Sequence, residues 1–234
     1  MPGTRVSTSA SIWKTTSGAD RAAPNAAVVR TAFPICSFGL AALTVAAFVA
    51  APLPELPLAA DAFWQGVLDR QRPSEPWRTV TAHLLHTDLN HLFWNLLALV
   101  VLAWTIERRS RLLLMLSLLV GMVAVGVWFF SLTDAPYYCG FSGVLNALLV
   151  VALYTLYLPH DLRGLAAPRR HVYNGILVLV AVGALVKNLY ELATGAALVS
   201  NTAWDSAPGA HLAGWVAGLG VVLAACWRSR PEGR

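Results

Sequence analysis

Charge is scarce in this sequence. Asp, Glu, Lys and Arg together make up 12% of its 234 residues, whereas soluble globular proteins carry about 25%. Hydrophobic residues make up 57% of the chain, and the mean hydropathy is +0.59. This shortage of charge excludes an ordinary soluble domain and predicts an integral membrane protein.

Cysteine is also scarce. The three cysteines, Cys36, Cys139 and Cys226, are odd in number and show no paired spacing. They therefore indicate neither a disulfide framework nor a thiolate metal site. Cys139 lies three residues before a serine of interest, and we interpret it as a small packing residue.

A third absence is alternation. No run of about ten residues alternates apolar and polar side chains, so a transmembrane barrel is not expected. The chain instead has six apolar stretches of roughly 16 to 21 residues, and a helix needs about 20 residues to cross the hydrocarbon core. These stretches predict an all-α integral membrane protein, a bundle of six transmembrane helices. They are 35–53, 91–106, 112–132, 142–158, 172–190 and 210–227.

Basic residues are distributed unevenly along the chain. When six helices are threaded with the N-terminus inside, thirteen of the 17 Lys and Arg residues fall on the inner side. This bias follows the positive-inside rule, so both termini are expected in the cytoplasm. The net charge of +5 then reflects membrane topology, and no nucleic-acid partner is expected. The inner residues are Arg5, Lys14, Arg21, Arg30, Arg108, Arg109, Arg111, Arg163, Arg169, Arg170, Arg228, Arg230 and Arg234.

The membrane domain is predicted over residues 33–228, between two cytoplasmic tails. Residues 1–32 are polar and rich in Ala, Ser and Thr, which is typical of a disordered tail. Residues 229–234 form the second tail. The chain therefore carries one domain.

The longest outer connection covers residues 54–82. Within it, Phe63-Trp64 and Val67-Leu68 have helical spacing, and aromatic residues suit a membrane interface. We expect a short amphipathic segment lying along the outer leaflet. It would serve either as a structural cap on the bundle or as a loop that guides substrate.

A serine between glycines opens the fourth apolar stretch, in Gly140-Phe141-Ser142-Gly143. Small residues let another backbone approach closely, and the first N–H groups of a helix can bind an oxyanion. We hypothesise that Ser142 is a nucleophile. The alternative from these residues alone is a helix start that is capped by serine and flanked by packing glycines.

Polar side chains also gather at the start of the second apolar stretch. His91 and Asn95 are four residues apart, so they share one helix face and can both donate hydrogen bonds. Two convergent donors suit a developing oxyanion. The rival interpretation is a metal site made of His83, His86 and His91, with His211. We do not favour a metal, because the glutamate of an H-E-x-x-H motif is missing and no acid shares that helix face.

The sixth stretch begins with Ala210-His211 and continues with Gly214 and Gly218, a small-residue face that predicts close helix packing. In the six-helix threading, the second, fourth and sixth helices all run inward. His91, Asn95, Ser142 and His211 therefore share one layer near the outer face. With no buried acid placed to orient the histidine, we predict a Ser–His dyad.

Together these motifs resemble the rhomboid intramembrane serine proteases. The resemblance rests on G-x-S-G at 140–143, H-x4-H-x3-N at 86–95 and A-H-x-x-G at 210–214, and it covers roughly residues 77–225. It implies that Ser142 is the nucleophile and His211 the general base. It also implies an oxyanion hole made of His91, Asn95 and the Ser142 N–H, a bracing role for His86, and motif glycines at Gly140, Gly143 and Gly214.

Within that family the chain is most similar to the rhombosortase branch. The residues that carry this similarity are Pro76-Trp77-Arg78 and the segment from Tyr138 to Leu145. Rhombosortases process bacterial proteins that end in a GlyGly-CTERM tail. The chain departs from the pattern at Asn146, where rhombosortases usually carry His and many rhomboids Tyr. Asn146 shares the Ser142 face and could bond His211 or a water.

The resemblance implies an intramembrane endopeptidase in the bacterial inner membrane, with its active site facing the periplasm. Its partners would be the lipid bilayer and membrane-anchored proteins with a C-terminal transmembrane tail, and it would need no cofactor or metal. Two alternatives remain, a general rhomboid protease acting on single-span proteins and an inactive rhomboid-like protein that binds or escorts helices. A transporter is not favoured, because paired charges and broken helices are missing at mid-membrane.

Overall fold

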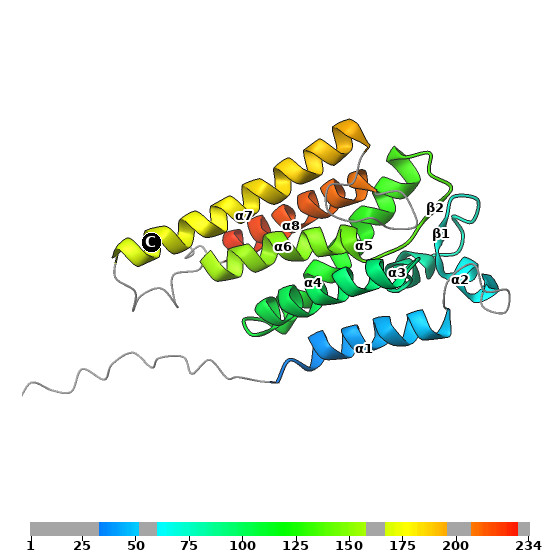
Figure 1. Ribbon diagram of the computed structural model, residues 1–234, viewed down its shortest axis with the longest axis horizontal. Coiled ribbons are helices and arrows are strands. Elements are labelled where there is room, and N and C mark those ends of the chain that lie inside the picture. Colours follow the sequence, from blue (N-terminus) through cyan, green and yellow to red (C-terminus); the bar gives the residue numbers. More distant parts are fainter. Residues whose placement is uncertain (1–32, 52–59, 158–166, 196–206, 229–234) are drawn as a thin grey trace, which may run out of the picture. The chain divides into compact units, whose positions relative to one another are not determined.

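The computed structural model describes residues 33–51, 60–157, 167–195 and 207–228. The predicted tails, 1–32 and 229–234, lie outside the described residues, as do residues 54–59 of the predicted outer connection. The elements follow one another along the chain as shown in Figure 1. They are α1 (Ile35–Ala50), α2 (Ala60–Gly66), β1 (Leu68–Asp69), α3 (Arg78–Leu84), α4 (Leu89–Glu107), α5 (Arg111–Leu132), β2 (Tyr137–Tyr138), α6 (Ser142–Tyr157), α7 (Ala167–Thr194) and α8 (Pro208–Arg228).

Each of the six apolar stretches forms a helix, namely α1, α4, α5, α6, α7 and α8. Four of these, α4, α5, α7 and α8, are long and apolar enough to cross a membrane. The apolar helices α1 and α6 each have 16 residues, which corresponds to about 24 Å at the α-helical rise. The described part of the chain is thus a helical membrane protein with four candidate spans. Six spans remain a prediction.

Polar side chains cap two of these helices. The Asp88 carboxylate accepts the His91 N–H at 2.7 Å and begins α4, and the Ser110 hydroxyl accepts the Leu113 N–H at the start of α5. Such caps satisfy N–H groups that have no partner inside the helix. At the far end of α4, Glu107 accepts the Ser37 N–H at 2.8 Å, which joins α4 to the start of α1.

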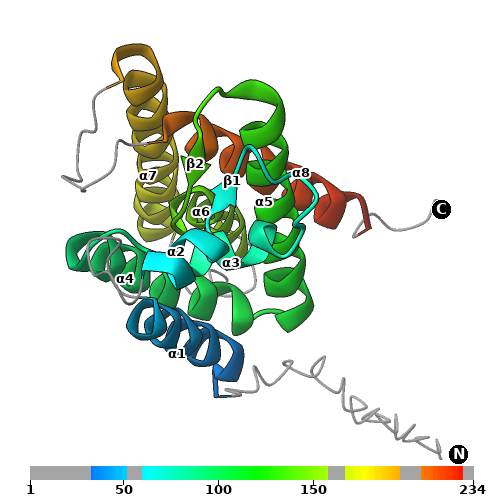
Figure 2. The ribbon, with the colours of Figure 1, turned by 90° about the vertical axis from the view of Figure 1, so that its right-hand side faces the viewer.

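The short helix α6 lies among α4, α5, α7 and α8, as Figure 2 shows from the end of the bundle. Its buried apolar side chains pack with those of α4 and α5 in the main core. Against α8 it is small residues that make the contact. A Cβ at Gly214 would overlap the Gly143 carbonyl oxygen, and one at Gly218 would lie 2.7 Å from the Ala147 oxygen. The predicted close packing along these glycines is confirmed.

The outer connection forms two short helices and a two-stranded ladder. Leu68 pairs with Tyr138 in antiparallel register, which joins this connection to the segment that leads into α6. The predicted short helix exists as α2, where Phe63 is fully buried against protein, as is Val67 just after it, while Trp64 is exposed. The position of this helix along the outer leaflet stays a prediction. Buried Arg78 holds the connection, because its Nη1 donates to the Val67 carbonyl at 2.7 Å.

Candidate active site

Ser142 is the first residue of α6, and His211 lies in the first turn of α8. The serine Oγ is 3.1 Å from the histidine Nε2, a hydrogen-bond distance, although 69 residues separate the two in sequence. His211 is buried, while Ser142 is partly exposed. A hydroxyl that is bonded to an imidazole and still accessible can act as a nucleophile.

Gly140 shapes the turn that presents Ser142. Its φ is +107°, a conformation that L side chains rarely adopt. A Cβ at this position would also lie 2.7 Å from the His91 ring. Gly140 is therefore required twice, for its backbone angle and because the imidazole fills the space of a side chain.

His83 and Tyr138 both hold the Gly140 carbonyl. His83 Nδ1 donates to this oxygen at 3.1 Å, and the Tyr138 hydroxyl donates at 3.2 Å. Burial lowers the pKa of His83 to about 4, so the ring is neutral at pH 7. The sequence interpretation placed His83 only in the rival metal site and gave Tyr138 no role of its own in the catalytic site. Residues this far apart in the sequence give no local pattern that predicts a shared contact, so only the fold reveals it.

His86 connects the end of α3 to α4. Its Nδ1 donates to the Leu84 carbonyl at 3.2 Å, and its Nε2 accepts from the Asn95 amide at 2.9 Å. Burial, with a smaller contribution from the neighbouring His91, lowers the pKa of His86 to about 3, so this tautomer is neutral. An amide has a second N–H, and His86 fixes the direction in which that second donor of Asn95 points.

His91 Nε2 lies next to Gly140, and Nδ1, the second ring nitrogen, has a hydrogen-bond partner. Its Nδ1 lies 3.3 Å from the Thr87 hydroxyl, which also lies 3.0 Å from the Asp88 carboxylate. The hydroxyl has one proton, so its direction sets the tautomer of His91. That proton is donated to the Asp88 carboxylate, so Thr87 accepts from His91 Nδ1–H. The imidazole proton moves to Nε2, the nitrogen next to Gly140, when the Thr87 hydroxyl turns from Asp88 and donates to Nδ1.

Asn146 contacts α7. Its amide donates to the Ser142 carbonyl at 2.9 Å, and its oxygen accepts from Asn188 at 2.8 Å. We expected a bond to His211 or a water. Among the described residues Asn146 instead joins α6 to α7, because its side chain leaves α6 on the side where α7 lies.

An acid lies beside the histidine, contrary to the prediction. Glu191 in α7 is 1% exposed, and its Oε2 lies 3.4 Å from His211 Nδ1 and 2.7 Å from Lys187 Nζ. We missed it because the predicted helix ended at residue 190, whereas α7 continues to Thr194. The signal was present, since Lys187 and Glu191 are four residues apart in an apolar segment.

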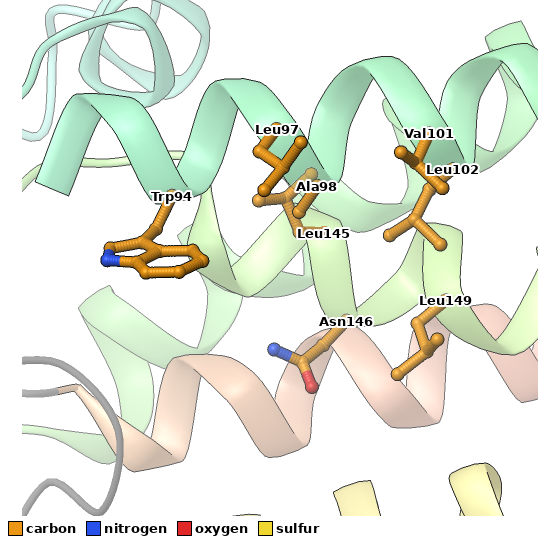
Figure 3. Close-up of a pocket in the computed structure, with 8 residues that line it drawn as sticks. All are labelled: Trp94, Leu97, Ala98, Val101, Leu102, Leu145, Asn146 and Leu149. Atoms are coloured by element: carbon orange, nitrogen blue, oxygen red, sulfur yellow. The ribbon is translucent and has the colours of Figure 1, made fainter.

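An apolar groove runs between α4 and α6 (Figure 3). It has a volume of about 390 Å³, and Asn146, one turn beyond Ser142, contributes an amide to its lining. The groove therefore starts close to the candidate nucleophile. Its lining residues are Trp94, Leu97, Ala98, Val101, Leu102, Leu145, Asn146 and Leu149.

Cys139 is the cysteine nearest to Ser142 in the sequence. Cys139 is buried in the cluster around Phe63 and Leu85, and burial raises the pKa of its thiol to about 12. It is thus a protonated packing residue. Within the ranges that the structure describes, no three His, Cys, Asp or Glu side chains are grouped to hold a metal.

The chain matches a known protein family. The family model described as the Rhomboid domain matches residues 73–228, which is about two thirds of the chain. The match includes Ser142, His211, His91 and Asn95. None of the curated proteins matches the chain.

Proposed function

Because the chain belongs to the rhomboid family, we propose that it is an intramembrane serine endopeptidase. The observation that carries this proposal is the 3.1 Å contact between Ser142 Oγ and His211 Nε2. Serine proteases predominate in this family, although inactive members exist. Retention of a hydroxyl–imidazole pair at the start of two packed helices favours an active enzyme over an inactive helix-binding relative.

In the proposed reaction Ser142 Oγ attacks the carbonyl carbon of a peptide bond while its proton passes to His211 Nε2. The imidazolium then returns that proton to the leaving amine, which leaves an ester on Ser142. In the second half a water attacks this ester while its proton passes to His211 Nε2. The imidazolium returns the proton to Ser142 Oγ, and the product with the new carboxyl group leaves. No cofactor is needed.

The oxyanion of the tetrahedral intermediate would be bound by His91, Asn95 and the N–H of Ser142. The Asn95 amide is aimed by its bond to His86. His91 donates from Nε2 once the Thr87 hydroxyl turns from Asp88 and donates to Nδ1. The Ser142 N–H is among the first of α6 and has no acceptor within its own helix. All three donors adjoin the turn at Gly140.

We further propose that the substrate is a transmembrane helix, and more specifically the GlyGly-CTERM tail of a bacterial protein. The apolar groove beside Asn146 supports a helical substrate. The segments at 76–78 and 138–145 support the rhombosortase branch. The positive-inside bias supports cytoplasmic termini and an active site that faces the periplasm. A general rhomboid protease acting on single-span proteins remains the second candidate.

The test uses the purified full chain in liposomes with two substrates, a protein fused to a GlyGly-CTERM tail and an ordinary single-span protein. Ser142→Ala and His211→Ala should each lower cleavage at least about 10³-fold, and Asn95→Ala should lower it about 10²–10³-fold. Ser117→Ala is the matched control, because Ser117 is buried in α5 and bonded to the Leu113 carbonyl, away from this site.

Three outcomes would contradict parts of the proposal. Cleavage by Ser142→Ala at the wild-type rate would remove the nucleophile. Cleavage of only the ordinary single-span protein would remove the rhombosortase assignment and leave a general rhomboid protease. No cleavage of either substrate, together with no labelling of Ser142 by a fluorophosphonate, would favour an inactive helix-binding protein.

A further inference from the structure

The helix α7 buries polar residues where an apolar helix would bury leucines. Of its residues that the structure describes, the buried ones are Asn188 and Glu191, 2% and 1% exposed. The apolar side chains of α7, such as Leu179 and Val186, are exposed. Burying a carboxylate in a membrane protein is expensive unless it meets a partner. Glu191 therefore has a reason to face inward.

The partners of Glu191 lie on two helices. On α7 itself, Lys187 Nζ donates to Oε2 at 2.7 Å. On α8, His211 Nδ1 lies 3.4 Å from the same oxygen. The lysine ammonium and a protonated His211 each favour the ionised carboxylate. A negative charge is thereby held next to the imidazole, on the side opposite to Ser142.

His211 needs an acceptor at this place. Its Nε2 faces the Ser142 hydroxyl and must be unprotonated to act as a base, so the neutral ring carries its proton on Nδ1. This Nδ1 is completely buried and makes no hydrogen bond with the described residues. The 3.4 Å separation from Glu191 is a few tenths of an ångström beyond a good hydrogen bond. Catalytic hydrogen bonds are often long before substrate binds and shorten in the complex.

We propose that Glu191 is a positioning residue for His211, so that α6, α8 and α7 together supply a Ser–His–Glu arrangement. The carboxylate accepts the Nδ1 proton and thereby holds the tautomer whose Nε2 faces Ser142. When the Ser142 proton moves to Nε2, the carboxylate stabilises the imidazolium and takes up no proton itself. This catalytic role depends on the proposed proteolysis, whereas the pairing of Glu191 with His211 does not.

The charged and titratable groups around His211 come from three helices. Ser142 faces it from α6 and the Glu191–Lys187 pair from α7, while His91 in α4 lies within electrostatic range. The alternative role for Glu191 is to neutralise Lys187 and fix α7. The two roles differ in what removal of Lys187 does. A structural pair fails in the same way whichever partner is lost, whereas loss of Lys187 leaves the carboxylate free to act on His211.

The experiment measures the imidazole of His211 directly, by histidine-labelled NMR of the full chain in micelles across pH, and kcat and KM in parallel. Glu191→Gln should lower the titration midpoint of His211 and reduce the fraction of the Nδ1–H tautomer. Its kcat should fall about tenfold to hundredfold, with KM changed less than about twofold. Lys187→Met should raise the midpoint, because a cation next to the carboxylate is lost, and should lower kcat much less.

Two results would overturn the inference. The first is that His211 keeps its wild-type titration midpoint and tautomer in Glu191→Gln. The second is that the His211 midpoint shifts in the same direction in Glu191→Gln and Lys187→Met. If Glu191→Gln does not fold, Glu191→Asp replaces it. Asp keeps the charge but withdraws the carboxylate by one methylene, so an intermediate midpoint is expected, and a wild-type value overturns the proposal.

The NMR measurement also separates this inference from the proposed function, because it uses no substrate. A shifted midpoint in a chain that cleaves nothing would sustain the Glu191–His211 pairing and refute the protease. Normal cleavage by Glu191→Gln with an unshifted midpoint would refute the pairing and sustain the protease.

Discussion

The helices α8 and α7 both bring side chains to the candidate active site, but they are attached to α6 in opposite ways. Along α8 the backbones touch, since Gly214 and Gly218 leave no room for a Cβ against α6. Along α7 the described contact with α6 includes a polar side-chain bond, from Asn188 to Asn146, and most of the helix surface is exposed. Steric packing thus holds Ser142 and His211 at a fixed separation, whereas α7 is held by hydrogen bonds that can exchange. A helix with few buried apolar contacts is the one that moves at lower cost.

The largest expected effect comes from breaking the α6–α8 contact. In Gly214→Ala the new methyl group would overlap the Gly143 carbonyl oxygen, so α8 must move and His211 with it. We expect a loss of about 3 kcal/mol in the free energy of unfolding, and little proteolysis. Gly220→Ala is the control, because a Cβ at Gly220 meets nothing within 4 Å. It should stabilise the same helix by about 0.5–1 kcal/mol. Denaturation in mixed micelles measures both, and equal effects of the two variants would refute the packing argument.

A smaller effect is expected at the turn before Ser142. Gly140→Ala combines a positive φ with a methyl group 2.7 Å from the His91 ring. It should cost about 2 kcal/mol and displace His91, the proposed oxyanion donor. Gly195→Ala shares the positive φ, +70°, but its Cβ would meet nothing within 4 Å. The difference between the two variants measures the contact with His91. If kcat falls no further in Gly140→Ala than in Gly195→Ala, the contact with His91 is unimportant.

On the α7 side the expected loss is smaller again. Asn188→Ala leaves the Asn146 oxygen without its bond to α7 and should cost about 1.5 kcal/mol. Asn174→Ala, on the same helix, removes an amide whose buried oxygen has no hydrogen bond among the described residues. It should therefore be close to neutral. Thermal denaturation of both variants checks this, and a greater loss from Asn174→Ala would contradict the assignment of Asn188 as the residue that holds α7.

The smallest effect near neutral pH concerns the histidines that support the site. Burial lowers the pKa values of His83 and His86 to about 4 and about 3. In the unfolded chain the pKa of each histidine is about 6.5, so as the pH falls the unfolded state binds protons before the folded state does. Stability is then complete above pH 6.5 and is lost as the pH falls toward 4. At pH 5.5 each histidine should cost about 1 kcal/mol. His83→Gln should flatten this slope, and an unchanged slope would show that His83 does not titrate on unfolding.

Much of the fold could be read from the chain alone. All six apolar stretches are helices, because an uninterrupted apolar run in a membrane protein must satisfy its backbone internally. The helix directions that the charge bias predicts place Ser142 and His211 in one layer, and the two side chains lie 3.1 Å apart. The orientation itself stays a prediction. The errors occurred where a residue's environment depends on a neighbour in space. No acid was expected beside His211, yet α7 brings Glu191 within 3.4 Å of its Nδ1. Phe63 and Val67 had the spacing of an interfacial helix, yet they are buried in a cluster with Leu85 and Cys139.

The sequence by itself determined which segments are helices, where Gly214 and Gly218 allow two of them to touch, and which side chains are costly to place in a membrane. These properties depend on residue type and on spacing within one helix. Only the tertiary structure decided that Glu191 meets His211, that Asn146 bonds Asn188, and that His83 holds Gly140. Such contacts depend on the rotation and depth of one helix relative to another, and no periodicity within a single helix encodes them.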